Sequence, residues 1–410
     1  MNIIIFGVTG ELYKQKLAPA LWYLFSSEMF PQNTKIIGFG RKPLGNGGLK
    51  VFTEDAVTQK KQNLNKKKLE KFLSLFEYVE GNIDDSEGFK RLKEKVSESK
   101  ETSLFYLAVP QEITEAICRN IIKVGLHKNK AGGLARIMIE KPFGTSGAHA
   151  RKLDNLLRKS FTDEQIFRID HYLAKETMLH ILPLRFSNKD LIKIWGNKYI
   201  ERIRVVFAEE EKSEDKIEKR GEFYDGVGAL RDVGQNHVLQ MLTAIVMEKP
   251  KDKTATNIQT ARAQVLQKFK ISQNATLVRG QYKGYLEEPE VKKDSKTETF
   301  FRVTLELKEK KWKDVPLIIE SGKALDHEEM SMEIFFKNVD STDPSLKFVI
   351  VSSGNDAYEK VLEYAIRGEK HIFTSREEVL AEWKITENIM KKWKDSPLLV
   401  YEKGSALERI

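Results

Sequence analysis

Cysteine is almost absent from this chain, which has Cys118 and no other among its 410 residues. A disulfide needs two cysteines, so no bridge can form within the chain, and a zinc site built on thiolates is not expected. A chain without disulfides suits a reducing compartment. We therefore expect a cytoplasmic protein that holds no metal ion.

Long apolar runs are absent as well. Apolar runs such as Ile3–Phe6 and Val349–Val351 are no longer than a strand, whereas a membrane helix needs roughly 20 apolar residues. The first residues lack the basic head, the long apolar stretch and the cleavage site of a secretory signal. The motifs HExxH and GxxxxGK(S/T) are missing too, which argues against a metalloprotease or a P-loop enzyme. We expect no membrane partner.

The composition is that of an ordinary globular protein, with 40% hydrophobic and 31% charged residues. A chain of 410 residues is too long for one core, so we expect two domains. The net charge of +9 suits an acidic ligand such as a nucleotide, a sugar phosphate or nucleic acid. The densest basic run, Lys60–Lys71, has helical character and no interleaved aromatic residue. This favours a solvated helix face, and we predict no nucleic-acid partner.

Apolar strands alternate with helical stretches over residues 1–145. The helix after the first strand is expected over Glu11–Phe30, with a start or a kink at Pro19. Strands separated by helices indicate βαβ units and hence a parallel sheet. We therefore predict an α/β fold with a parallel sheet in an N-terminal domain over residues 1–145. Its expected strands are Asn2–Phe6, Lys35–Phe39, Ser103–Leu107 and Ala135–Ile139.

Residues 146–410 follow a different pattern, in which strands succeed one another with few helices between them. Hairpin-like connections between such strands indicate a mostly antiparallel sheet, so we predict a second, C-terminal domain over residues 146–410. The expected strands are Arg202–Phe207, Phe300–Leu307, Leu317–Glu320, Met332–Phe336 and Lys347–Val351. The expected helices are Ala148–Leu157, Lys175–Leu182, Gly226–Met247, Asp356–Gly368 and Ser375–Lys392.

A glycine turn follows the first strand, where Gly7-Val8-Thr9-Gly10-Glu11-Leu12 opens the first helix. Glycines here let the backbone approach a pyrophosphate, whose charge is favoured at the helix N-terminus. The spacing is GxxG rather than GxGxxG, so the motif alone fits a tight strand-to-helix turn equally well. Its place after the first strand of a βαβ unit favours a dinucleotide site.

Two cations follow the second strand, in the sequence Gly40-Arg41-Lys42. Enzymes that use NAD usually have an acidic residue there, which holds the ribose 2′-hydroxyl. A 2′-phosphate needs cations instead, and arginine can clamp it through two hydrogen bonds. A surface pair of basic residues is the alternative, but the nearby glycine turn favours NADP as the cofactor.

Three polar segments indicate a catalytic site: Ile139–Gly144, Arg168–Glu176 and Arg231–His237. Oxidation of an alcohol needs a base that takes the hydroxyl proton, and histidine titrates near neutral pH. His237 suits that role, with Asp170 as the carboxylate that orients its ring. A single histidine is more often structural than catalytic, but the three segments together are far more specific than any one of them.

The same segments hold groups that suit a phosphorylated substrate. A phosphate needs clustered donors, which His171, Tyr172 and Lys175 could supply. Pro142 favours a tight or even cis turn, which would direct Lys141 into the crevice.

Seven motifs occur in an order and a rough spacing that are typical of one family: GVTGEL, FYLAVP, IEKPFG, RIDHYLAKE, RDVGQNHVLQMLTAIVMEKP, SGKALD and DAYEKVL. On these motifs the chain resembles the glucose-6-phosphate dehydrogenases from residue 3 to about residue 402. RIDHYL with its lysine, and RDVxQNH, are highly specific to that family, whereas GxxGxL is not. The resemblance implies oxidation of glucose 6-phosphate at C1 to 6-phosphogluconolactone with reduction of NADP, the first step of the oxidative pentose phosphate pathway.

The resemblance also implies a role for each candidate residue. His237 would be the general base, paired with Asp170. The implied phosphate ligands are His171, Tyr172 and Lys175. The implied sugar contacts are Lys141, Glu209, Asp232 and Lys323. The implied dinucleotide contacts are Gly7, Thr9, Gly10, Glu11, Leu12 and Arg41, with Lys16 and Lys141 near the nicotinamide. The family fold is a Rossmann domain followed by a β+α domain, so the resemblance implies an NADP-binding Rossmann domain over residues 1–145 and a substrate-binding β+α domain over residues 146–410. The family's large antiparallel sheet usually forms the dimer interface, so the resemblance implies a homo-oligomer such as a dimer.

The chain departs from the usual residues of the family at several places. The departures are Ala174 for glycine, Glu11 for aspartate, Gln111 for a second proline after Pro110, Glu320 for a basic residue, and Asp326–Glu329 for a stretch with a further Arg or Lys. The last of these removes a cation that would reach the phosphate. The segment between Met332 and Asp356 is much shorter than in the family, so we expect a smaller sheet.

Two other functions stay open from the sequence. A dehydrogenase of a related aldose phosphate would keep the base and change the sugar pocket. A sugar-phosphate or nucleotide sensor would bind without turnover. The set of Asp170, His237, Lys141 and Lys323 argues against a sensor, because a protein that only binds needs no base. The missing phosphate cation and the shorter sheet argue weakly for it.

The predicted role of Arg41 can be tested by substitution. If its guanidinium grips the 2′-phosphate, Arg41→Ala should raise KM for NADP far more than KM for NAD, because NAD lacks that phosphate. The measurement is the steady-state rate with each cofactor in parallel. Equal losses with both cofactors would refute the role.

Overall fold

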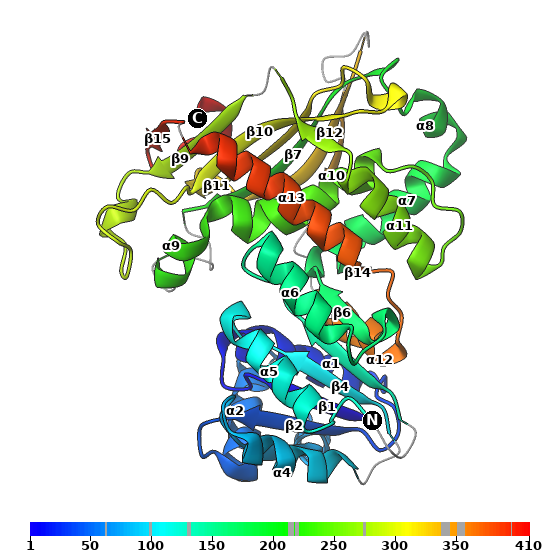
Figure 1. The fold of residues 1–410 in the computed structure, drawn as a ribbon, viewed down its shortest axis with the longest axis vertical. Helices are drawn as coiled ribbons and strands as arrows, with labels where there is room; N and C mark the ends of the chain where they lie inside the picture. Colours follow the sequence, from blue (N-terminus) through cyan, green and yellow to red (C-terminus); the bar gives the residue numbers. More distant parts are fainter. Residues whose placement is uncertain are drawn as a thin grey trace. The chain divides into compact units, whose positions relative to one another are not determined.

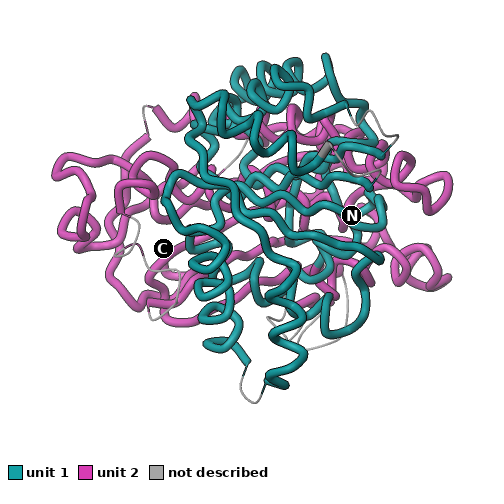
Figure 2. The backbone as a smooth tube through the Cα atoms, turned by 90° about the horizontal axis from the view of Figure 1, so that it is seen from below, with its two compact units in different colours: residues 1–174, 353–374 teal, residues 175–352, 375–410 magenta. Residues whose placement is uncertain are grey.

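The computed structural model describes residues 1–61, 64–97, 101–128, 133–211, 217, 221–273, 276–337, 345–350, 357–394 and 396–410. The chain forms two compact units, each with its own sheet (Figures 1 and 2). The first unit holds Met1–Ala174 and Ser353–Thr374, and the second holds Lys175–Ser352 and Ser375–Ile410. The chain therefore leaves the first unit and returns to it late in the sequence.

A seven-stranded sheet forms the centre of the first unit, in the order β3-β2-β1-β4-β5-β6-β14. All neighbouring pairs are parallel except β6 and β14. This order is that of a doubly wound dinucleotide-binding fold, which confirms the predicted Rossmann-type sheet. Its strands are β1 (Asn2–Phe6), β2 (Lys35–Gly40), β3 (Phe76–Glu80), β4 (Ser103–Leu107), β5 (Ala135–Ile139), β6 (Ile166–Ile169) and β14 (Phe373–Thr374).

Helices flank this sheet, and the central strands are buried along their length because both faces are covered. The helices are α1 (Ala18–Ser26), α2 (Gly45–Lys60), α3 (Lys66–Leu73), α4 (Ser86–Ser97), α5 (Gln111–Lys123), α6 (Gly147–Leu157) and α12 (Ala357–Arg367). A π-helical turn at Tyr13–Leu17 precedes α1, and short 3₁₀ turns lie at Asp163–Gln165 and His171–Ala174. The predicted kink at Pro19 is thus a π-helical turn just before the proline.

The structure contains strands that the sequence pattern did not predict. β3 and β6 are short and carry charges, and Arg168 within β6 is neutralised by a buried ion pair with Asp154 of α6. β6 continues the parallel sheet beyond β5, and β14 adds an antiparallel strand at its edge. The first compact unit consequently runs to Ala174 and takes in Ser353–Thr374, whereas the sequence predicts a domain boundary at residue 145.

A second, eight-stranded sheet organises the other unit, in the order β13-β12-β7-β11-β10-β9-β15, with β8 paired to β10. The pairs β7–β11 and β9–β15 are parallel, and the remaining pairs are antiparallel, as predicted. Its strands are β7 (Ile200–Glu210), β8 (Phe269–Ile271), β9 (Leu277–Tyr282), β10 (Phe300–Leu307), β11 (Leu317–Leu325), β12 (Glu329–Phe336), β13 (Ser345–Val349) and β15 (Leu398–Tyr401). The predicted hairpin between β11 and β12 is wrong, because β7 lies between them and pairs with both.

The second unit also carries the helix that was predicted as Gly226–Met247. That helix is interrupted at Gly228, whose φ is +75°, and continues as a π-helical segment over Leu230–Val238. The helices of this unit are α7 (Glu176–Ser187), α8 (Lys189–Ile194), α9 (Gly221–Ala229), α10 (Leu239–Val246), α11 (Ala255–Leu266) and α13 (Arg376–Trp393). Short 3₁₀ turns lie at Tyr285–Glu287, Lys310–Trp312 and Leu407–Arg409.

Two ends of predicted elements, Val351 and Asp356, lie outside the described residues. Within the described part of the chain, none of the helices has the length and the apolar character needed to cross a membrane.

The close approach of β1 to β4 gives a test of the fold. A methyl group on Gly7 would lie 2.2 Å from the carbonyl oxygen of Ala108, so Gly7→Ala should lower the free energy of unfolding by about 1–3 kcal/mol beyond the cost of its positive φ. Gly45→Ala is the matched control, because Gly45 also has a positive φ but has no atom within 4 Å of the new methyl. Urea unfolding of both variants measures the difference, and equal losses would contradict the steric argument.

Candidate active site

The glycine turn lies at the point where the strand order of the first sheet reverses, between β1 and β4. Gly7 has a φ of +89° and leaves no room for a side chain beside Ala108. The amide of Gly10 donates to the carbonyl oxygen of Gly7 at 3.0 Å, which closes the turn before the helix begins. A turn of this kind at this place fits the pyrophosphate of a dinucleotide. The other predicted contacts here are Thr9 and Leu12, which are half-buried, and Glu11 and Lys16, which are exposed.

Arg41 lies at the same edge of the sheet. β1 and β2 are parallel, with Phe6 opposite Phe39, so the turns that follow both strands start side by side. The side chains of Arg41 and Lys42 are exposed, and the hydroxyl of Tyr78 donates to the backbone oxygen of Lys42 at 2.6 Å. The backbone behind the two cations is therefore held in place while their charges face solvent.

The segment after β5 places Lys141 beside a buried carboxyl group. The peptide bond between Lys141 and Pro142 is cis, as the sequence suggested. The preceding residue, Glu140, is only 7% exposed, and the Tyr106 hydroxyl donates to its Oε1 at 2.5 Å. Burial raises the pKa of Glu140 to about 7, against the opposing effects of the Tyr106 hydrogen bond and the Lys141 charge. Sequence reasoning missed Glu140, although it belongs to the IEKPFG motif.

Asp170 follows the neighbouring strand, β6. β5 and β6 are parallel with Ile139 opposite Arg168, so Lys141 and Asp170 both lie two residues beyond a register pair, at the same edge. Asp170 is 2% exposed, and its Oδ1 accepts the amide of Tyr172 at 3.0 Å. The carboxylate is thus buried and fixed by the turn that follows it.

The phosphate candidates His171 and Tyr172 occupy that turn. The imidazole of His171 stacks on the ring of Tyr358 from α12, with centroids 5.1 Å apart and planes at 24°. Tyr172 is buried beside it, with its ring centroid 5.0 Å from that of His171. Sequence reasoning did not assign Tyr358 to the site, although the DAYEKVL motif contains it. Its contact with His171 joins two segments that are far apart in the sequence.

His237 lies on the π-helical segment of the second unit and is 1% exposed. Its ring stacks against Phe207 of β7, with planes at 17°, and its amide donates to the side chain of Asn236 at 2.7 Å. In an α-helix, residues five apart point roughly 140° away from each other. In a π-helix the backbone hydrogen bonds join residues that are five apart, so each turn contains more residues than in an α-helix. Asp232 and His237, which are five apart, therefore lie on the same side of this segment.

A buried charge cluster includes Asp232 of the same segment. The ammonium group of Lys323 forms an ion pair with Glu209 of β7 and lies 3.9 Å from Oδ2 of Asp232. It also lies 5.2 Å from the ring centre of Tyr224. The Tyr401 hydroxyl donates to the backbone oxygen of Lys323 at 2.7 Å. The structure thus brings together three of the predicted sugar contacts in a polar, largely dry site.

The predicted site is divided between the two units. Asp170, His171 and Tyr172 belong to the first unit, whereas His237 and Lys175 belong to the second. Lys175 is half-buried and directly precedes α7. The pairing of His237 with Asp170 and the grouping of the phosphate ligands therefore remain predictions.

Two of the residues that depart from the family pattern, Glu320 and Ala174, are buried among neighbours in this structure. Glu320, which stands where a basic residue is common, is 1% exposed and accepts from both Arg204 and Arg302 on the neighbouring strands. Ala174 is buried in the 3₁₀ turn that carries His171.

His327 lies on the surface rather than in a site. It is exposed and contacts Asp326 at 2.6 Å and Glu329 at 3.3 Å. Its hydrogen bond with Asp326 is the largest cause of its raised pKa, followed by that with Glu329. This arrangement is typical of a histidine in a surface loop.

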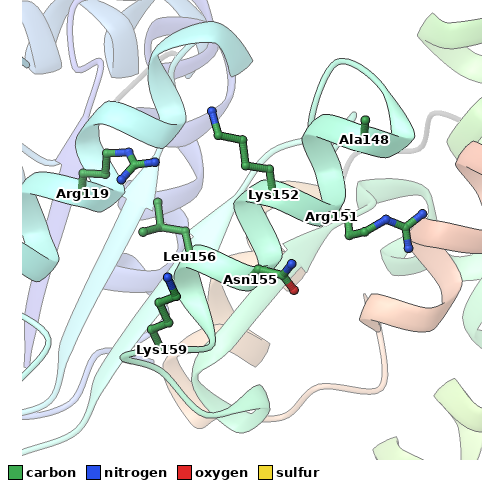
Figure 3. A pocket seen from close by; sticks show the side chains of 7 residues that line it. All are labelled: Arg119, Ala148, Arg151, Lys152, Asn155, Leu156 and Lys159. Atoms are coloured by element: carbon green, nitrogen blue, oxygen red, sulfur yellow. The ribbon is translucent and has the colours of Figure 1, made fainter.

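A basic pocket of about 430 Å³ lies between α5 and α6 (Figure 3). Glu115 neutralises part of its charge through ion pairs with Arg119 at 2.6 Å and Lys152 at 3.0 Å. The pocket is lined by Arg119, Ala148, Arg151, Lys152, Asn155, Leu156 and Lys159. None of the predicted site residues lines it, so we give it no part in the reaction.

A doubly wound fold with a glycine turn at its switch point, joined to a unit with a buried histidine, aspartate and lysine, defines a dehydrogenase that uses a nicotinamide dinucleotide. The chain matches the family model "Glucose-6-phosphate dehydrogenase, NAD binding domain" over residues 4–179. It matches "Glucose-6-phosphate dehydrogenase, C-terminal domain" over residues 182–347 and 343–408. The chain therefore belongs to the glucose-6-phosphate dehydrogenase family, and the resemblance seen in its motifs is confirmed.

Similar proteins match over nearly their whole length. The cytoplasmic isoform of glucose-6-phosphate 1-dehydrogenase from Solanum tuberosum is 31% identical, with 94% of this chain and 84% of that protein covered. Glucose-6-phosphate 1-dehydrogenase from Borreliella burgdorferi is also 31% identical, with 98% and 94% covered. A solved structure of a glucose-6-phosphate dehydrogenase in complex with its substrate glucose 6-phosphate superposes with a TM-score of 0.88 at 28% identity, covering 98% of this chain and 94% of that one.

The raised pKa of Glu140 predicts a pH-dependent stability. A carboxyl that holds its proton more tightly when folded stabilises the fold below its ordinary pKa of 4.5, and this stabilisation is lost as the pH rises to about 7. One pKa unit is about 1.4 kcal/mol, so the loss approaches about 3 kcal/mol. Glu140→Gln keeps an acceptor for Tyr106 but cannot ionise, so its stability relative to wild type should rise between these pH values.

Urea unfolding at pH 5, 6, 7 and 8 measures this difference. Glu54→Gln, on an exposed position of α2, is the control for the loss of a surface carboxylate. If wild type and Glu140→Gln lose stability in parallel across this range, Glu140 does not titrate there.

Proposed function

We propose that this protein oxidises glucose 6-phosphate at C1 to 6-phosphogluconolactone and uses NADP as the oxidant. The observation that carries the proposal is the buried cluster of Glu209 on β7, Lys323 on β11 and Asp232 on the π-helical segment that also holds His237. Burying such charges costs free energy unless they are paired, and their grouping beside a histidine suits recognition of a polyhydroxylated substrate. Membership of the family supplies the substrate class.

The chemistry follows from the residues. The imidazole of His237 accepts the proton of the C1 hydroxyl, and the carboxylate of Asp170 orients the ring and stabilises the imidazolium that forms. Glu209, Asp232, Lys323 and Lys141 would hold the sugar hydroxyls. His171, Tyr172 and Lys175 hold the phosphate through charged and neutral hydrogen bonds.

The dinucleotide would be held by the glycine turn from Gly7 to Leu12 and by Arg41. When bound, it supplies the acceptor for the two electrons that leave C1. The positive φ of Gly7 and its contact with Ala108 keep the backbone of the turn close to the sheet, which leaves space for a pyrophosphate. The exposed guanidinium of Arg41 would select the 2′-phosphate of NADP. Lys16 and Lys141 would lie near the nicotinamide.

The remaining proposals concern the oligomeric state, the cellular location and the partners of the enzyme. We propose a homo-oligomer, with the large sheet of the second unit as the interface. We propose a cytoplasmic location and no partnership with nucleic acid or membranes. The two-domain division at residues 145 and 146 stays a prediction.

The reaction can be tested by mixing purified protein with glucose 6-phosphate and either NADP or NAD, and following reduced cofactor by its near-ultraviolet absorbance. Rapid reduction of NADP with glucose 6-phosphate, and none with free glucose, is the expected result. No reduction by folded protein would overturn the proposal. If the cofactor were reduced only with another aldose phosphate, the proposed substrate would be wrong and the proposed type of reaction would stand.

The role of His237 is tested by His237→Asn. Loss of a general base typically costs a factor of about 10² to 10⁴, so kcat should fall by that amount while binding of glucose 6-phosphate changes little. His180→Asn is the control, because His180 is an exposed histidine of α7. An unchanged kcat in His237→Asn would rule out its role as base.

A further inference from the structure

Gln111 bridges the two ends of the loop that carries Lys141. It is the first residue of α5 and is 7% exposed. Its Nε2 donates to the backbone oxygen of Glu140 at 2.8 Å, and its Oε1 accepts the amide of Gly144 at 3.2 Å. One side chain therefore ties the residue before Lys141 to the end of the loop.

The two hydrogen bonds require the amide group of glutamine. A carbonyl oxygen must receive a donor and an amide N–H must meet an acceptor, so the side chain has one orientation that satisfies both. Glutamate of the same length could accept from Gly144 but would place an oxygen against the oxygen of Glu140. Methionine would fill the space and satisfy neither.

Both ends of the loop are also fixed by other contacts. At one end, the carboxyl of Glu140 is held by Tyr106. At the other end, Gly144 has a φ of +80°, and a methyl group there would lie 2.6 Å from the amide of Ala150. Gln111 connects these two fixed points, so the short segment between them, which includes Lys141, has little freedom to move.

We propose that Gln111 is a positioning residue that sets the place of Lys141 for the reaction, through its bridge between Glu140 and Gly144. The effect of Gln111 on catalysis rests on the proposed function, whereas the two hydrogen bonds of the bridge do not depend on that function. The family usually has a proline at this position, and proline has no side-chain donor or acceptor. The two side-chain hydrogen bonds that hold the Lys141 loop in this chain could not be made by a proline.

The bridge can be tested without any substrate. Backbone hydrogen exchange of the Gly144 amide should become faster in Gln111→Met, because its acceptor is gone. In Gln111→Glu the Gly144 amide should exchange more slowly than in Gln111→Met, since glutamate keeps the acceptor. If the methionine variant fails to fold, Gln111→Glu can be compared with the wild type instead. Wild-type exchange rates at Gly144 in both variants would overturn the bridge.

The positioning role is tested with glucose 6-phosphate and NADP. A small displacement of a catalytic group can cost up to about 100-fold in rate, so Gln111→Met should lower kcat by about 10- to 100-fold and change KM for NADP little. Gln165→Met is the matched control. Gln165 makes the same pair of bonds, accepting from the amide of Thr162 at 2.8 Å and donating to the oxygen of Ala135 at 2.7 Å, at the other end of β5. It should keep the wild-type kcat.

A double substitution separates positioning from general destabilisation. If Gln111 acts through Lys141, adding Gln111→Met to Lys141→Met should lower kcat no further, because residues that act as a unit are not additive. Multiplied losses would overturn the inference, as would a wild-type kcat in folded Gln111→Met. An inactive wild-type enzyme would instead overturn the proposed function, and the exchange rate of Gly144 would still decide whether the bridge exists.

Discussion

The arrangement of the second unit depends on the pairing of one buried ammonium group, that of Lys323, with Glu209. A charge removed from water is tolerated only with a partner, and here the partner is on β7 while the lysine is on β11. The register of these parallel strands shifts between Gly322 and Leu325, and Ala324 takes a φ of +55°. A regular strand would alternate its side chains between the two faces. Gly322 lies opposite Ala208, so Lys323 follows in register with Glu209, on the same face of the sheet, and the extra residue of the bulge is inserted after it.

A second constraint acts in the first unit, where parallel strands deliver polar residues to one edge. Gly7 follows β1, Lys141 follows β5 and Asp170 follows β6, and the carboxyl ends of parallel strands lie together. Buried polar side chains at such an edge need neighbours that hold them in position. Some of these neighbours come from segments that are distant in the sequence. Tyr358 arrives from α12, almost two hundred residues after the motif that it supports. The return of the chain to the first unit thus completes the surroundings of His171.

Much of the fold could be predicted from the sequence, since the largely apolar strands β1, β4 and β5 are local patterns. The family motifs are local as well, and the roles of the candidate residues within them stay predictions. The missing parts depend on distant partners. β6 reads poorly as a strand because Arg168 interrupts it, and only the buried contact with Asp154 makes that charge acceptable. The placement of β7 between β11 and β12 has no local signal. The π-helical geometry that brings Asp232 and His237 to one side is equally invisible in a periodicity that fits an ordinary helix.

Glu320 illustrates how the chain can differ from its family while keeping the neighbouring site. Its buried carboxylate lies between Arg204 and Arg302, on the strands at either side of β11. A basic residue in this place would put three cations together, and like charges about 4 Å apart repel by about 4 kcal/mol near a protein surface. A basic residue at position 320 is therefore incompatible with both arginines as they lie here, and we expect it to need changes at Arg204 and Arg302. Because Glu320 is three residues before Lys323, such an exchange can leave the ion pair with Glu209 in place.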